Sequence, residues 1–341
     1  RLQHAARCCA HARTAWAWEN LFVPAARGKT RVPCVRSTPG PGSRGPEETT
    51  AAAPVVTLFV LAQLIGVFTV TQAVTVNETV QVTNTGLGER PPLQGWQSVA
   101  YLVGGILLST ALILYIAKKN WVNIWKYWQS LATGIAVYLA ASTFTPPRIA
   151  TLIGAASFFI RLKTTNQYVN NAIELVMYAG ITVFLAPIFT VKTALVLLAI
   201  MSVYDAYAVW KSKHMVTLAE FTRRTKRFPG LTTGKQPSQI NHSPPTPSPE
   251  ENRSSFSVLG GGDILFPLLF TATLYIETVT NGVPPLIALL YALITTTGAT
   301  IGLIALYATS DGESYYPALP YLTTGIYAGF LAVHALHLAM I

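Results

Sequence analysis

The chain has 341 residues, of which 51% are hydrophobic and only 11% are charged. A soluble domain usually carries about 25% charged residues, so this composition excludes an ordinary soluble protein. The formal net charge of +10 does not indicate nucleic-acid binding, because the basic residues lie in the N-terminal tail and between apolar runs, without a basic surface interleaved with aromatic residues. We expect a multi-pass integral protein of the cell membrane, surrounded by the lipid bilayer.

The first 51 residues differ from the rest of the chain. They are rich in Ala, Arg and Pro, and they contain no apolar run long enough to span a membrane. The three cysteines, Cys8, Cys9 and Cys34, all lie here, with neither a disulfide framework nor a zinc-binding spacing. We predict that residues 1–51 are a disordered basic tail or an expression-derived segment.

Nine apolar runs follow. They fall at about 53–74, 95–117, 127–144, 148–161, 172–189, 193–210, 258–276, 284–307 and 318–340. Eight of them are about 18 residues or longer, which is enough to cross roughly 30 Å of hydrocarbon at 1.5 Å per residue. The run 148–161 is shorter and follows Pro146-Pro147, so a re-entrant or half-length helix is an alternative there.

The basic residues between the runs help to count the spans. One cluster, 118–126, follows the second run, and a larger one, 211–227, follows the sixth. Basic residues favour the cytoplasmic side, so both clusters lie there only if an even number of spans separates them. Counting 148–161 gives four spans and omitting it gives three. The sequence therefore predicts an all-α membrane protein of nine transmembrane helices, with the N-terminus in the cytoplasm and the C-terminus outside.

A long polar segment, 211–257, divides the nine spans. Its Pro/Ser-rich stretch, 243–249, is unable to bury a core, so we predict a mobile cytoplasmic loop. The organisation is then a six-helix membrane portion, 52–210, followed by the loop and a three-helix membrane portion, 258–341.

Two acidic residues lie within these spans at matching positions. Asp205 precedes the cytoplasmic end of the sixth run by six residues, and Asp263 follows the start of the seventh by a similar interval. Six residues of helix rise about 9 Å. Because the two spans run in opposite directions and consecutive spans are usually neighbours, we expect both carboxyl groups at one depth, facing each other.

A carboxylate inside a membrane is costly and indicates function. Two adjacent carboxyl groups share a proton, which is what an aspartic protease requires. The ionised group takes a proton from water while the protonated one hydrogen-bonds the oxyanion. Three alternatives remain open: a proton or cation relay in a transporter or ion-leak protein, an inactive scaffold, or carboxyl groups that merely pair with Tyr204 or Tyr207.

Two irregular segments accompany the aspartates. Gly260-Gly261-Gly262 precedes Asp263 and suggests a loosened start to the seventh span, where backbone approaches a ligand closely. Pro317-Ala318-Leu319-Pro320 begins the ninth span. These prolines either leave unpaired backbone groups that line a cavity or simply start a helix.

At these places the chain resembles the presenilin and signal-peptide-peptidase group of intramembrane aspartic proteases. That group has Tyr-Asp in the sixth span, Gly-x-Gly-Asp in the seventh and Pro-Ala-Leu at the ninth. Here the motifs are Tyr204-Asp205, Gly260-Gly261-Gly262-Asp263 and Pro317-Ala318-Leu319. The resemblance covers roughly residues 52–341, and the short connections make it most similar to a compact archaeal presenilin homologue. Gly261 departs from the Leu that is common at the variable position.

The resemblance implies an aspartic endopeptidase that cleaves the transmembrane segments of single-span membrane proteins. It implies a catalytic dyad of Asp205 and Asp263, with no cofactor and no metal. Residues that contact substrate would be Tyr204, Gly260, Gly261, Gly262, Pro317, Ala318 and Leu319. We expect Glu174, in the fifth span, to be structural, and we expect His334 and His337, in the ninth, to be packing or interfacial residues.

Overall fold

The structure is a computed structural model, and it describes residues 46–76, 80–82, 93, 95–119, 121–210, 230–234, 257–310 and 316–340. The described helices belong to one unit, residues 45–341. The first six spans are α1 (Pro46–Ala73), α2 (Trp96–Lys118), α3 (Val122–Ala141), α4 (Pro147–Lys163), α5 (Gln167–Leu185) and α6 (Val191–Trp210), with a 3-10 turn, η1 (Ala186–Ile188), between the last two. The seventh, eighth and ninth are α8 (Gly261–Thr280), α9 (Pro285–Thr309) and α10 (Ala318–Met340).

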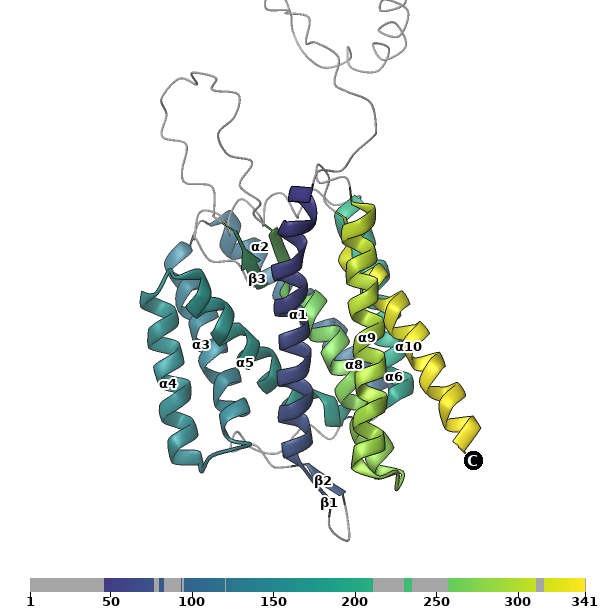
Figure 1. The fold of residues 1–341 in the computed structure, drawn as a ribbon. Helices are drawn as coiled ribbons and strands as arrows, with labels where there is room; N and C mark the ends of the chain where they lie inside the picture. The colour runs from purple at the N-terminus through teal and green to yellow at the C-terminus, as the bar shows by residue number, and fades with distance from the viewer. Residues whose placement is uncertain are drawn as a thin grey trace, which may run out of the picture. The chain divides into compact units, whose positions relative to one another are not determined.

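Two short antiparallel sheets accompany the helices (Figure 1). β1 (Val74–Val76) pairs with β2 (Val80–Val82) directly after α1. β3 (Gly230–Thr233) pairs with β4 (Ser257–Gly260), and β4 runs straight into α8. The β3–β4 sheet lies near the first turns of α1, and the β1–β2 sheet lies at the opposite end of that helix (Figure 1).

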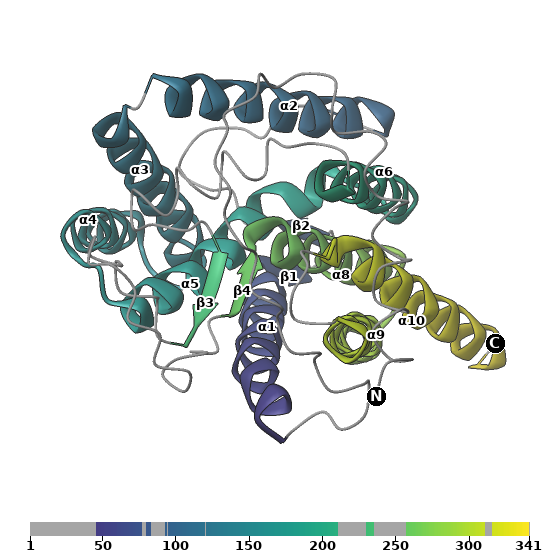
Figure 2. The ribbon, with the colours of Figure 1, turned by 90° about the horizontal axis from the view of Figure 1, so that it is seen from above.

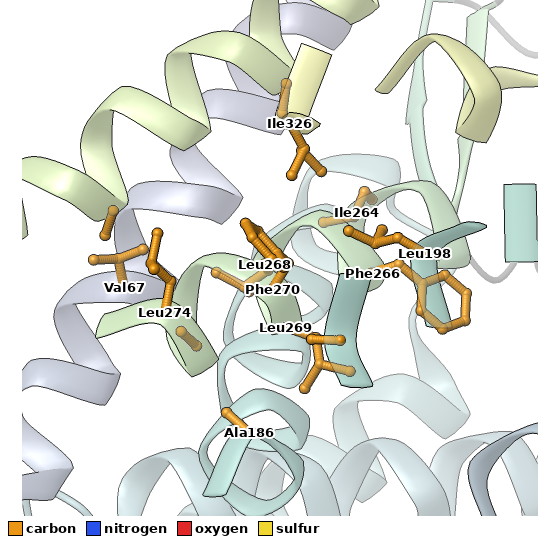
Figure 3. Close-up of a cluster of buried hydrophobic side chains, with 14 of the residues drawn as sticks. Val67, Ala186, Leu198, Ile264, Phe266, Leu268, Leu269, Phe270, Leu274 and Ile326 are labelled. Atoms are coloured by element: carbon orange, nitrogen blue, oxygen red, sulfur yellow. The ribbon is translucent and has the colours of Figure 1, made fainter. Parts of the chain in front are cut away.

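The helix α8 lies at the centre of the described fold. It packs against α1, α5, α6, α9 and α10, and the view from above shows it among these neighbours (Figure 2). Every residue from 266 to 275 is buried. Leu268, Leu269 and Phe270 form the middle of an apolar cluster that Val67 of α1 and Ile326 of α10 complete (Figure 3). The helix that carries Asp263 is therefore held on all sides by packing.

Pro267 lies within α8 and removes one backbone donor from its hydrogen-bond ladder. In a membrane, backbone groups freed in this way need a partner from a neighbouring helix. The carbonyl that loses its helical donor is that of Asp263, four residues before Pro267. The next carbonyl, that of Ile264, accepts a hydrogen bond from Nε2 of the fully buried Gln63 of α1 at 3.0 Å. The first turns of α8 are thereby tied to α1.

Glycines allow several helix pairs to pack backbone against backbone. A Cβ at Gly298 of α9 would lie 2.3 Å from the carbonyl oxygen of Gly325 of α10, and one at Gly325 would lie 2.1 Å from that of Gly298. A Cβ at Gly180 of α5 would likewise lie 1.8 Å from the carbonyl oxygen of Ala136 of α3. Small residues at such crossings are how membrane helices associate closely.

The predicted architecture of nine helices is confirmed in the described part of the chain, where seven of them are long and apolar enough to span a membrane. The doubtful run 148–161 is a continuous helix, α4, of 17 residues. Two boundaries differ from the prediction. The helix α1 begins at Pro46, inside the predicted tail, and α8 begins at Gly261 because residues 257–260 pair as strand β4. Most of the predicted mobile loop lies outside the described residues.

Candidate active site

Asp205 lies on α6, one turn before the helix ends at Trp210. Its side chain is partly buried, as is that of Tyr204, which packs against the main apolar core. Tyr207, two residues after Asp205, is 60% exposed and therefore lies outside the core. Of the two neighbouring tyrosines, only Tyr204 therefore belongs to the packed surroundings of the carboxyl group.

Asp263 lies in the first turn of α8, and the three glycines before it make room for close contacts. The amide of Gly260 donates to the Asp263 carboxyl group. A Cβ at Gly260 would lie 3.0 Å from Oδ2 of Asp263, and one at Gly261 would lie 2.8 Å from Oη of Tyr178. Gly260 has extended backbone angles, φ −64° and ψ 149°, which any residue adopts, so close approach explains these glycines.

The third motif starts the helix α10. The first amides of a helix have no partner within it and attract negative groups. Here the amides of Ala318 and Leu319 donate to the carboxyl group of Asp205, the latter at 3.2 Å. Both residues are buried, at 7% and 4% exposure. Of the two interpretations left open by the sequence, the structure shows the helix start, and the first amides of that helix donate to Asp205.

The structure thus brings the predicted motifs of α6, α8 and α10 together. The charge of Asp205 acts on Asp263, and both residues are intermediate in exposure. In general, two neighbouring carboxyl groups of which one keeps its proton are suited to activating a water molecule for attack on a carbonyl group.

A sheet edge lies directly beside Asp263. In β3, the backbone of Gly230 and Thr232 bonds to side chains of α5, so the pairs that bond across the sheet are Leu231 with Leu259 and Thr233 with Ser257. The backbone groups of the alternate β4 residues, Val258 and Gly260, then point away from β3. Within the described residues no strand pairs with that edge.

The residues that anchor β3 were not predicted from the sequence. No role was assigned to Arg161, which ends the run 148–161, yet it is 2% exposed and forms an ion pair with Glu174, which is 1% exposed. Glu174 also accepts from the amide of Gly230 at 2.9 Å. A signal was present in the sequence, because Gln167, Asn171 and Glu174 recur at the spacing of one helix face.

The two histidines of α10 do not meet. His334 is exposed, whereas Nδ1 of His337 lies 3.1 Å from the hydroxyl of Tyr291 on α9. Among the described residues, no group of three or more His, Cys, Asp or Glu side chains is arranged to hold a metal ion.

These features define a class, a multi-pass membrane protein with paired aspartates where three helices and a sheet edge meet. The family model described as signal-peptide peptidase, presenilin aspartyl protease matches residues 56–338. The chain belongs to this family of aspartyl proteases, and it is a multi-pass integral membrane protein.

Two solved structures of a presenilin family intramembrane aspartate protease are similar to the chain in fold. The form in space group C222 has a TM-score of 0.55 and 18% sequence identity, over 84% of this chain and 99% of that one. The form in space group P2 has a TM-score of 0.51 and 19% identity, over 83% and 97% respectively. No protein of curated function matches the sequence.

Proposed function

We propose that the chain hydrolyses peptide bonds within the transmembrane segments of single-span membrane proteins, with Asp205 and Asp263 as the catalytic dyad. The observation that carries this proposal is the convergence of the three motifs: the first amides of α10 donate to Asp205, and the charge of Asp205 acts on Asp263 at the start of α8. The sequence motifs in these elements are far apart in the chain, and a transporter gives no reason for all three to converge. No observation favours the relay alternative.

The chemistry follows from the pair. The ionised carboxyl group takes a proton from water, and the water oxygen bonds to the carbonyl carbon of the scissile peptide. The protonated carboxyl group donates a hydrogen bond to the developing oxyanion. When the tetrahedral intermediate collapses, the carbonyl re-forms, the C–N bond breaks, and the leaving nitrogen takes the proton that the first carboxyl group removed from water. The hydrogen bonds from the amides of Ala318 and Leu319 hold the carboxyl group of Asp205 in place during these steps.

A transmembrane substrate is helical, and its carbonyl groups are already hydrogen-bonded. It must therefore unwind before water reaches a peptide bond, and its freed backbone groups then need partners. The outward edge of β4 offers such partners at Val258, two residues before Gly260, whose own amide donates to the carboxyl group of Asp263. Addition of the unwound segment as a further strand satisfies its backbone. We infer that substrate binds along β4, with Gly260, Gly261, Gly262 and the Pro317-Ala318-Leu319 segment lining its path.

The test is cleavage of a purified single-span substrate by the detergent-solubilised protein. Asp205→Asn and Asp263→Asn should each lower the cleavage rate at least about a thousandfold, because the variant pair no longer shares a proton between two carboxyl groups. Expression and monodispersity should be retained. Tyr207→Phe, an exposed change on the same helix, should cleave like wild type.

Activity should also pass through a maximum with pH, since one carboxyl group must be ionised and the other protonated. Wild-type rates in either Asn variant would refute the mechanism. Proton or cation flux that depends on Asp205 and Asp263, without proteolysis, would establish the relay instead.

A further inference from the structure

The strand β3 has α5 on one side and β4 on the other. Gly230 and Thr232 direct their backbone groups to α5, and Leu231 and Thr233 direct theirs to β4. Gly230 has φ +148°, a conformation that favours glycine. Both edges of β3 are therefore occupied, so the outer edge of β4 is the one edge of this sheet that no described strand or α5 side chain pairs with.

Three polar side chains on one face of α5 hold β3, and we call them the α5 clamp: Gln167, Asn171 and Glu174. Asn171 acts on both backbone groups of Thr232, since its Nδ2 donates to the carbonyl at 2.7 Å and its Oδ1 accepts from the amide at 3.3 Å. Gln167 also donates to that carbonyl. Glu174 accepts from the Gly230 amide at 2.9 Å.

Glu174 is itself fixed by a buried ion pair with Arg161 of α4. The Arg161 guanidinium donates to Oε1 of Glu174. Oε2 of Glu174 accepts from the amide of Gly230 and, at 3.3 Å, from the hydroxyl of Tyr178. A buried ion pair contributes little net stability compared with an apolar pair of similar volume. Its charges are therefore not explained by stability, whereas the bond to the strand gives the carboxylate a specific role.

We propose that the α5 clamp is a positioning element that preforms the β3–β4 sheet, and so sets the register at which a substrate segment adds to β4. This inference rests on the proposed function. The clamp residues do not touch substrate. They act through β3, which holds Ser257 and Val258 at the free end of β4, while the other end of that strand is fixed by its continuation into α8.

The expected consequence of a loosened clamp is slippage. Strand register is weakly specified where a strand is poorly held, and a shift of the substrate moves a different peptide bond to the dyad. We therefore expect KM to rise about fivefold or more and cleavage to spread to neighbouring bonds, with kcat within about threefold of wild type. A purely structural role would lower activity without changing which bond is cut.

Two charge-neutral double variants isolate the hydrogen bond to Gly230. Arg161→Met with Glu174→Gln removes both charges but keeps a side-chain acceptor for the Gly230 amide. Arg161→Met with Glu174→Leu removes both charges and the acceptor. The first should retain wild-type products and KM, and the second should show the raised KM and the spread of cleavage sites, measured by mass spectrometry of the products.

Single variants give a second comparison. Asn171→Ala removes both bonds to Thr232 and should behave like the Leu-containing double variant. Tyr168→Ala on the same helix changes a side chain that is 83% exposed and should behave like wild type. Identical product patterns and KM in all four variants would overturn the positioning role.

Hydrogen–deuterium exchange of substrate-free protein separates this proposal from the proposed function. The segment 230–234 should be protected in wild type and in the Gln-containing double variant, and it should exchange at least about tenfold faster in the Leu-containing one. Equal protection of residues 230–234 in the two double variants would overturn the proposal that the α5 clamp holds β3. If the wild type cleaves no substrate at all, the proposed function fails and the positioning role with it, whereas exchange alone would still show whether α5 anchors β3.

Discussion

Leu319 contributes to the site through its backbone and its side chain separately. Its amide donates to Asp205, and its side chain is 4% exposed. Leu322, three residues later on α10, is fully buried in the apolar core. Comparison of the two leucines therefore separates a role in substrate positioning from a role in packing.

We predict that Leu319→Ala lowers the cleavage rate at least about tenfold, or roughly 1.4 kcal/mol of activation free energy, because small displacements of a reacting bond are costly. Both Leu319→Ala and Leu322→Ala should lower the free energy of unfolding by about 2–5 kcal/mol, since each removes a buried side chain. Rates and thermal unfolding in detergent check this. If the two variants lose activity equally, the loss reflects packing alone.

The three glycines before Asp263 should differ in their tolerance of a methyl group. A Cβ at Gly261 would lie 2.8 Å from the Tyr178 hydroxyl, whereas one at Gly262 would have its nearest contact at 3.4 Å, with Phe266. We predict that Gly262→Ala retains activity within about threefold and that Gly261→Ala loses about tenfold.

The same distances predict a rescue. Tyr178→Phe removes the hydroxyl that the new methyl group would meet, so Gly261→Ala combined with Tyr178→Phe should regain most of the activity lost in the single variant. A double-mutant cycle of cleavage rates measures this coupling. An additive double variant would contradict the close approach of α5 to the start of α8.

Individual site residues were predictable to different extents. Asp205 and Asp263 were identified because carboxyl groups are rare in apolar spans and stood at matching distances from the span ends. Arg161 was not identified, because a basic residue at the end of a span usually indicates topology alone. Its partner Glu174 lies on the next helix. Nothing local in the sequence indicates that the two side chains are buried together.

At the scale of elements, one hydrogen bond sets the register of α6 against α8. Glu277, near the end of α8, accepts from the amide of Val191, the first residue of α6, at 2.6 Å. Val191 precedes Asp205 by 14 residues (205 − 191), and Glu277 follows Asp263 by 14 (277 − 263). Each interval rises about 21 Å, so this bond brings the two aspartates of the antiparallel pair to one level.

We predict that Glu277→Ala lowers kcat about tenfold, because loss of this bond lets α6 slide against α8 and separates the carboxyl groups. The free energy of unfolding should fall by about 1.5–3 kcal/mol, as expected for one hydrogen bond to a charged group. Glu277→Gln keeps an acceptor for the Val191 amide and should remain near wild type. Steady-state kinetics and thermal unfolding of the three proteins test this, and equal kcat in all of them would exclude a register-setting role.

The helices were largely predictable, and the β3–β4 sheet was not. Apolar runs report transmembrane helices because every residue of the run faces lipid or the packed core. The strand β3 is a four-residue segment between polar stretches, and it is stabilised by α5 side chains and by a partner strand that begins 24 residues after β3 ends (257 − 233). Such long-range pairing leaves no periodic pattern, so residue 257 was assigned to the loop and residues 258–260 to the seventh span.

At the scale of the whole molecule, the β3–β4 sheet and the dyad belong to one end of the helices. The loop 164–166 between α4 and α5 should share that end, because an even number of helices, α5 and α6, separates it from β3. The loop 281–284 between α8 and α9 should lie at the opposite end, because one helix, α8, separates it from β4. The basic clusters at 118–126 and 211–227 predict that the end with the dyad faces the cytoplasm.

Labelling of single cysteines tests this orientation. Thr165 and Asn281 are exposed and lie in these two loops. In a background without Cys8, Cys9 and Cys34, an impermeant thiol reagent applied to intact cells should label Asn281→Cys and spare Thr165→Cys, whereas both should react after the membrane is permeabilised. The physical reason is that Lys and Arg are retained on the cytoplasmic side during insertion. Labelling of Thr165→Cys alone would show the opposite orientation, with the dyad near the outer face. Water and substrate ends would then reach the dyad from outside the cell.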